Sequence, residues 1–156
     1  MRLRWAKINE EAYKAVRGLQ DVVDKSSLDH KLLELVKIRA SQLNGCAYCL
    51  DMHTKDARAI GESEQRIYLL PAWREASYYS SKERAALAWC EALTLLPQSG
   101  APDSVYSELE NNFSGEEIVE LTIAIVTINT WNRLAVGFRT EAGSYVSNRA
   151  LKLTKK

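Results

Sequence analysis

Apolar residues recur every three or four positions along most of the chain, the spacing that places side chains on one face of an α-helix. In the first such stretch, residues 9–23, the repeating positions are Ala12, Val16, Leu19 and Val23. The same spacing predicts further helices over residues 29–43, 46–60, 62–70, 80–96, 102–112 and 118–136. We therefore expect an all-α fold.

Residues that end or begin helices stand between these stretches. Asn44–Gly45 follows the second, and Pro97 follows the helix predicted to end at Leu96. The patterns SSKE at residues 80–83 and SGEE at residues 114–117 match the capping box, in which a serine and a glutamate satisfy each other's backbone N–H groups. These signals support the helix boundaries that the apolar spacing indicates.

The stretch 118–136 is apolar on more than one face, and its β-branched residues would also suit a buried strand. Its capped start and its length favour a helix. A helix that is apolar all round is buried. We expect it at the centre of the protein or between subunits.

Length and composition set the frame for this helical pattern. The 156 residues are enough for one domain, predicted to span 1–156. The net charge of +1 gives no sign of a nucleic-acid partner. No apolar run approaches the ~18 residues of a membrane span, and the N-terminus does not resemble a signal peptide. We therefore expect a cytoplasmic protein without a membrane partner.

Most of the chemically reactive side chains gather in the sequence NGCAYCLDMHTK, residues 44–55. It holds two of the three cysteines and one of the two histidines. On a helix, Cys46, Cys49 and His53 share one face, with His53 one turn beyond Cys49. Cys46 falls at or near the helix N-terminus, where backbone N–H groups and the helix dipole stabilise a thiolate.

This arrangement suits a two-cysteine redox cycle. One thiolate attacks a peroxide, a sulfenic acid forms, and the second thiol resolves it to a disulfide. His53 could take the proton of Cys49, directly or through water. Two other interpretations remain open at this point. In one, the cysteines pack as small core residues; in the other, Cys46, Cys49 and His53 bind zinc with Glu34, His30 or water as the fourth ligand.

The segment ELVKIRASQLNGCAYCLDMHTKDARAIGESEQRI, with ERAALAWCEALTLL and EEIVELTIAIVTINTWNRLAV after it, resembles the alkylhydroperoxidase D / carboxymuconolactone decarboxylase family. The resemblance covers residues 28–138. Its central motif is a glutamate followed, about a dozen residues later, by C-x-x-C-x-x-x-H. Here these positions are Glu34, Cys46, Cys49 and His53.

The resemblance implies an all-α, oligomeric thiol peroxidase that needs no cofactor. Glu34 and His53 would relay a proton and activate Cys49, which attacks the hydroperoxide. Cys46 would resolve it, and an unidentified thiol donor would reduce the disulfide. The family assembles as dimers, trimers or hexamers. The alternative is a non-enzymatic zinc-binding or redox-sensing protein that uses Cys46, Cys49 and His53.

The residues and the resemblance do not agree at every position. The helix dipole favours Cys46 as the thiolate, whereas His53 favours Cys49, and we assign the attack to Cys49. By pattern alone, Glu34 on a helix rich in Lys and Arg would face solvent. Tyr48 stands where some members carry a second histidine, and the decarboxylase branch lacks the cysteine pair. Cys90, among apolar residues, is predicted to be a buried core thiol.

Overall fold

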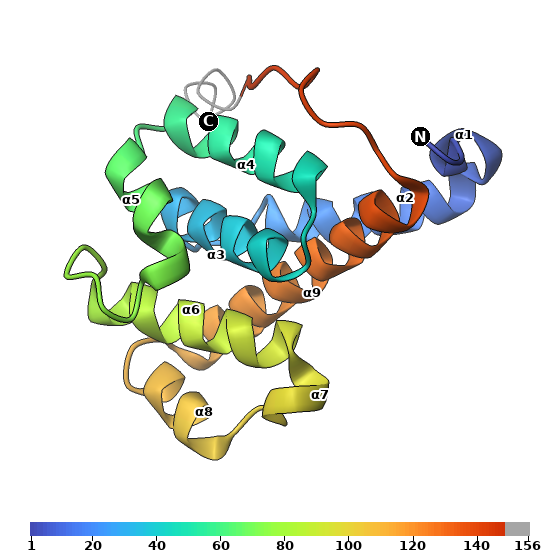
Figure 1. The fold of residues 1–156 in the computed structure, drawn as a ribbon. Coiled ribbons are helices and arrows are strands. Elements are labelled where there is room, and N and C mark those ends of the chain that lie inside the picture. The colour runs from blue at the N-terminus through green and yellow to red at the C-terminus, as the bar shows by residue number, and fades with distance from the viewer. Residues whose placement is uncertain (149–156) are drawn as a thin grey trace.

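The computed structural model describes residues 1–148, so the last part of the predicted domain, residues 149–156, lies outside the described residues. The described part is helical and contains no strand (Figure 1). Its elements are α1 Trp5–Ile8, α2 Glu10–Val23, α3 His30–Leu43, α4 Ala47–Ala59, α5 Glu64–Leu69, the 3-10 helix η1 Leu70–Ala72, α6 Ser81–Thr94, α7 Leu96–Ser99, α8 Asp103–Glu110 and α9 Gly115–Phe138. The predicted all-α fold is confirmed.

Helix α3 lies at the centre of this arrangement, in contact with α4, α6 and α9 (Figure 1). Leu33 and Val36 belong to an apolar core shared with α6 and α9, while Leu35 and Ile38 belong to a second core with α5 and η1. Each fully buried aliphatic side chain contributes about 1.5–3 kcal/mol. Packing on several faces therefore fixes α3, the helix that holds Glu34.

The capping residues act as the sequence indicates. Ser80 with Glu83, and Ser114 with Glu117, form complete capping boxes at the starts of α6 and α9. One boundary differs from the prediction. Pro97 does not end the fifth helix; it lies in the first turn of the separate α7, where proline is tolerated because the N–H there has no intrahelical partner.

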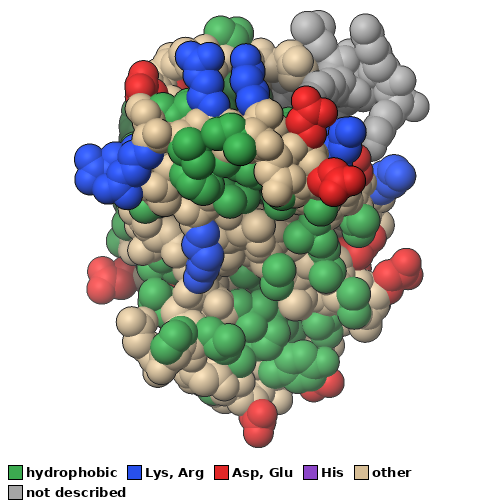
Figure 2. All heavy atoms as spheres, turned by 90° about the vertical axis from the view of Figure 1, so that its right-hand side faces the viewer, with side chains coloured by type: hydrophobic (Ala, Val, Ile, Leu, Met, Phe, Trp, Pro, Cys, Tyr) green, Lys and Arg blue, Asp and Glu red, His purple; other side chains and the backbone are tan. Residues whose placement is uncertain are grey.

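Helix α9 is confirmed as a long, central helix. It packs against α2, α3, α4, α6 and α8, and its buried face includes Ile125 and Ile128. Its other face reaches the surface, where Val119, Val126 and Val136 are exposed. Apolar side chains are prominent on the side of the molecule seen in Figure 2. Assembly into an oligomer stays a prediction.

The N-terminal end of the described chain lies near the end of α9, and the C-terminal end of the described chain lies over α4. The N-terminal amino group pairs with Glu141 at 2.7 Å, and the Arg2 N–H donates to the Phe138 carbonyl at 2.7 Å. The segment after α9, residues 139–148, crosses above α4 (Figure 1). None of the described helices is both long enough and apolar enough to span a membrane.

Candidate functional site

The C-x-x-C pair sits at the sharp turn between α3 and α4. Gly45 has φ +63°, a left-handed conformation that glycine adopts at little cost. The Cys46 N–H donates to the Ser41 carbonyl at 2.9 Å, which closes the turn. Helix α4 then runs back along α3, so that residues of its first two turns face Glu34.

Cys46 is the N-cap residue of α4, as its predicted place at or near the helix start requires. Its sulfur accepts a hydrogen bond from the Cys49 N–H at 3.4 Å, the contact that a serine oxygen makes in an ordinary cap. Both sulfur-bearing residues are buried. The helix start therefore offers one of its free N–H groups to the Cys46 sulfur.

The pKa values of the two cysteines are shifted in opposite directions. A hydrogen bond from the Cys49 thiol lowers the pKa of Cys46 to about 7, despite burial. The same bond, together with burial, raises the pKa of Cys49 far above its ordinary value. The Asn132 side chain, on α9, lowers the pKa of both. The pair thus holds one proton between two sulfurs near neutral pH.

Glu34 is buried and forms the centre of a charged cluster. Its Oε2 lies 2.8 Å from His53 Nδ1, and its Oε1 accepts a hydrogen bond from Lys37 Nζ at 3.0 Å. Burial alone would raise the pKa of Glu34, but the charge of Lys37 and the hydrogen bonds from His53 and Lys37 outweigh it and hold the pKa well below its usual range. The pattern-based expectation that Glu34 faces solvent is wrong, because these two partners compensate its burial.

An ionised Glu34 sets the tautomer of His53. A carboxylate only accepts hydrogen bonds, so we assign the proton of the neutral ring to Nδ1. Nε2 is then left as the proton acceptor. In the described part of the chain no hydrogen bond joins His53 to the Cys49 sulfur directly. Proton transfer between them would use a water molecule or the substrate.

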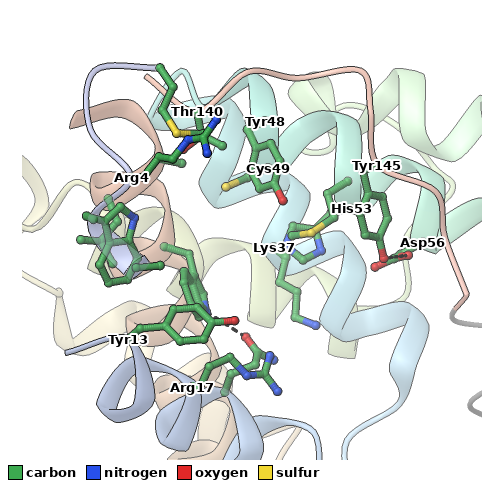
Figure 3. Close-up of a pocket in the computed structure, with 18 of the residues that line it drawn as sticks. Arg4, Tyr13, Arg17, Lys37, Tyr48, Cys49, His53, Asp56, Thr140 and Tyr145 are labelled. Atoms are coloured by element: carbon green, nitrogen blue, oxygen red, sulfur yellow. Dashed lines mark hydrogen bonds between the residues drawn. The ribbon is translucent and has the colours of Figure 1, made fainter. Parts of the chain in front are cut away.

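A cavity of about 670 Å³ opens over Cys49 and His53 (Figure 3). Glu34 and Lys37 also reach it. Cys46 does not; it lines a smaller cavity of about 230 Å³ behind the start of α4. A molecule in the larger cavity would therefore meet Cys49 and not Cys46.

The wall opposite α4 is aromatic. Trp5 stacks on Phe138 with ring centroids 6.1 Å apart, and Tyr13 meets the edges of Trp5 and Trp131 at 5.9 and 6.3 Å. The indole N–H of Trp131 donates to Gln20, which satisfies its one polar atom. The cavity thus has an apolar side that α1, α2 and α9 build together.

The segment after α9 closes the cavity beside His53. Tyr145 donates its hydroxyl proton to Asp56 at 2.8 Å, and the Ser147 hydroxyl donates to the same oxygen at 2.5 Å. Lys55 on α4 donates to the Tyr145 carbonyl at 2.9 Å. Burial and the Asp56 carboxylate raise the pKa of Tyr145, so that its hydroxyl keeps its proton. Figure 3 shows Tyr145 standing next to His53 and Asp56.

The site brings together all four predicted residues, but not as the zinc hypothesis required. Within residues 1–148, the group of potential ligand atoms within 4.8 Å of one another is Glu34, His53 and Asp56, with neither cysteine. The Lys37 ammonium already neutralises Glu34 at 3.0 Å. The positive charge of Lys37 disfavours a metal ion beside Glu34. Because neither cysteine belongs to the ligand group, the geometry does not support a zinc site of Cys46, Cys49 and His53.

Sequence reasoning missed four residues of the site: Lys37, Asp56, Asn132 and Tyr145. Lys37 carried a signal, because it lies three residues after Glu34 and so shares its helix face. Asn132 and Tyr145 reach the cysteines and Asp56 from more than eighty residues away in the chain. No local pattern marks contacts of that kind.

Comparisons with known proteins agree with this picture. A model of the carboxymuconolactone decarboxylase family matches residues 10–92. The uncharacterized protein YdfG of Bacillus subtilis (strain 168) is 42% identical over 143 residues, 92% of this chain and 97% of YdfG. A crystal structure from Agrobacterium tumefaciens, of a protein of unknown function suggested to be the antioxidant defence protein AhpD, is 49% identical with a TM-score of 0.89 and covers 92% of this chain and 99% of its own.

More distant structures share the fold alone. The debrominase Bmp8, solved in complex with 2,3,4-tribromopyrrole, has a TM-score of 0.80 at 20% identity, over 88% of this chain and 74% of its own. The family match spans more than half of the chain, and YdfG is similar over nearly all of it. The chain therefore belongs to the alkylhydroperoxidase D / carboxymuconolactone decarboxylase family.

Proposed function

We propose that this protein is a thiol-dependent peroxidase that reduces hydroperoxides through a dithiol–disulfide cycle of Cys46 and Cys49. The observation that carries the proposal is the buried Glu34–His53 hydrogen bond of 2.8 Å, next to Cys49 at the floor of a cavity of about 670 Å³. A carboxylate that orients a histidine beside a thiol is the arrangement that activates nucleophilic cysteines.

The acidity of the pair and access from the cavity assign different roles to the sulfurs. Cys46 is the more acidic, with a pKa of about 7, but Cys49 lines the large cavity. A shift of the shared proton from Cys49 to Cys46 makes Cys49 the thiolate. The acidity of Cys46 thus supplies the negative charge, and access to the cavity selects Cys49 as the nucleophile.

The reaction then balances in three steps. The Cys49 thiolate attacks the outer peroxide oxygen, the O–O bond breaks, and the alkoxide takes a proton that His53 Nε2 has accepted from solvent, leaving as an alcohol. The Cys46 thiol attacks the Cys49 sulfenic acid, and a disulfide and water form. A dithiol or two monothiols, the unidentified reductant, then return two electrons and two protons to the pair.

The test is consumption of an organic hydroperoxide in the presence of a dithiol, measured for the wild type and for Cys49→Ser. The Cys46–Cys49 peptide is followed in the same samples by mass spectrometry. We expect turnover with a cycling disulfide in the wild type and neither in the variant. Thiols that stay reduced while peroxide persists would contradict the proposal, and zinc content would then be measured.

A further inference from the structure

The mouth of the cavity carries two cations without carboxylate partners. Arg4 and Lys7 line the cavity, and within residues 1–148 no carboxylate lies within 4 Å of either. The other cations of the lining differ in this respect. Arg17 pairs with Asp21 at 2.7 Å and Lys37 with Glu34 at 3.0 Å.

Two of the three carboxylates of the lining lie at the His53 end of the cavity, since Asp56 stands beside His53 and Tyr145, away from Arg4 (Figure 3), and Glu34 bonds His53. Glu34 holds Lys37 and His53, as described above, and Asp56 accepts the hydroxyls of Tyr145 and Ser147. Asp24 accepts a hydrogen bond from Gln20 at 3.0 Å. Asp24 and Asp56 keep their negative charges, because these donors are neutral, so the attraction for an anionic ligand is local to Arg4 and Lys7.

The positions of these groups divide the cavity into two parts. Arg4 lies on the side away from His53 and Tyr145, with Cys49 between them (Figure 3). The rings of Trp5, Tyr13 and Trp131 line the intervening wall. In the upper half of Figure 2, Lys and Arg side chains stand beside apolar ones, with Asp and Glu side chains among them.

We infer that the ligand of this cavity is an amphipathic carboxylate, whose apolar body lies on the aromatic wall and whose carboxylate meets Arg4 and Lys7. Guanidinium and carboxylate geometries match, and ring faces bind alkyl or aryl groups. The substrate class, which rests on the proposed function, is then a hydroperoxide of a fatty or aryl acid, with its peroxide group directed toward Cys49.

The expected preference is moderate, because the two cations are exposed and solvent screens them. We expect the acid to bind about fivefold more tightly than an uncharged analogue of equal length. Added salt should weaken binding of the acid and leave binding of the neutral analogue unchanged.

The test compares decanoate with decan-1-ol, two ligands without a peroxide group. Binding is followed by tryptophan fluorescence, since Trp5 and Trp131 line the cavity. The double variant Arg4→Gln, Lys7→Gln should lose the preference for decanoate. The matched control is Lys14→Gln, Lys25→Gln, which removes the same charge from two exposed residues that do not line the cavity.

Either of two binding results would overturn the inference: equal binding of decanoate and decan-1-ol by the wild type, or an equal loss of preference in both double variants. Turnover is measured separately, with an unsaturated fatty-acid hydroperoxide and its methyl ester. A preference in binding without turnover of either compound would leave the inference standing and contradict the proposed peroxidase. Turnover of the acid and its methyl ester at equal kcat/KM would support the proposed peroxidase and contradict the inference.

Discussion

Three cysteines are buried in this protein, yet their surroundings give them different chemistry. Cys90 lies in the middle of α6, and its thiol donates to the Val36 carbonyl at 3.4 Å. Burial raises the pKa of Cys90 to about 12. Cys46 is as deeply buried, but its pKa falls to about 7. Solvent exposure therefore does not distinguish Cys46 from Cys90.

The difference lies in which groups face each sulfur. In the middle of α6 the backbone N–H groups of that helix are bonded within it, and burial outweighs the hydrogen bonds that Cys90 receives from Thr94 and the Ala40 backbone. At the start of α4 the Cys49 N–H and the Cys49 thiol both point to Cys46. The predicted core role of Cys90 is confirmed, and the lowered pKa of Cys46 comes from a second sulfur and from a helix start.

The largest contrast should appear in the rates at which the thiols are alkylated. At pH 7 about half of Cys46 would be thiolate, against about one part in 10⁵ of Cys90, given their pKa values of about 7 and 12. We expect iodoacetamide to modify the C-x-x-C pair at least about 1000-fold faster than Cys90, measured by peptide mass spectrometry.

The control for this comparison is Cys90→Ala, which should leave the modification rate of the pair unchanged. Modification of Cys90 at a rate close to that of the pair would mean that the three sulfurs share one environment.

The next largest effect is expected at Glu34, whose removal affects both stability and chemistry. Glu34→Gln leaves the Lys37 ammonium buried without a counter-charge, which costs about 3–5 kcal/mol in the free energy of unfolding. It also removes the negative charge from the group that bonds His53 Nδ1 and leaves an amide that can turn either its oxygen or its NH2 group toward the ring, and we expect kcat/KM for hydroperoxide to fall at least about tenfold. Urea unfolding and peroxide consumption measure the two effects.

A second variant separates the structural role of Glu34 from its role in the relay. Glu34→Gln with Lys37→Met lacks both members of the buried ion pair, so no ammonium is left without its counter-charge, and it should recover most of the lost stability. Its activity should stay low, because the carboxylate is still missing. Recovery of activity together with stability would show that Glu34 acts only through the fold.

The pH dependence of Cys46 alkylation should show whether the hydrogen bond from Cys49 sets the pKa of Cys46. A thiol whose pKa is lowered is reactive above that pKa and loses reactivity as the pH falls through it, here through about 7. Cys49→Ala removes the donor, so the pKa of Cys46 should rise toward its ordinary value of 9.0. Alkylation at pH 7 should then slow by about 50-fold.

Cys49→Ser is the matched variant, because its hydroxyl can still donate to the Cys46 sulfur. It should lie between the wild type and Cys49→Ala in a pH–rate profile. Identical profiles for the three proteins would mean that the hydrogen bond between the cysteines does not set the acidity.

Much of this contrast could be predicted from the sequence, because its parts lie within one helix. The i, i+3 and i+7 spacing of Cys46, Cys49 and His53 placed them on one face, and the Asn44–Gly45 turn placed Cys46 at the helix start. The burial of Glu34 could not be predicted from the helix pattern. It depends on a partner nineteen residues away.

The contacts from distant segments were beyond the reach of local patterns. In the sequence, Asn132 is one of several polar residues in a mostly apolar helix, and Tyr145 follows that helix in a segment without an apolar repeat. Packing of α9 on α3, and of residues 139–148 over α4, brings them to the site. Such packing follows from the three-dimensional fold and leaves no periodic signal.

The smallest effect is expected at Asn132, whose amide lowers the pKa of both sulfurs but is not the main contribution to either. Asn132→Leu, of similar size, removes the amide. Its partners keep other bonds: Ser41 Oγ still donates to the Lys37 carbonyl at 2.7 Å, and Asn44 still donates to Asn129 at 3.0 Å. The variant should therefore fold, with the pKa of Cys46 raised by less than one pH unit and alkylation at pH 7 slowed about threefold. Cys90, which Asn132 does not contact, should react at its wild-type rate; a parallel change in Cys90 would instead indicate that the helices had loosened.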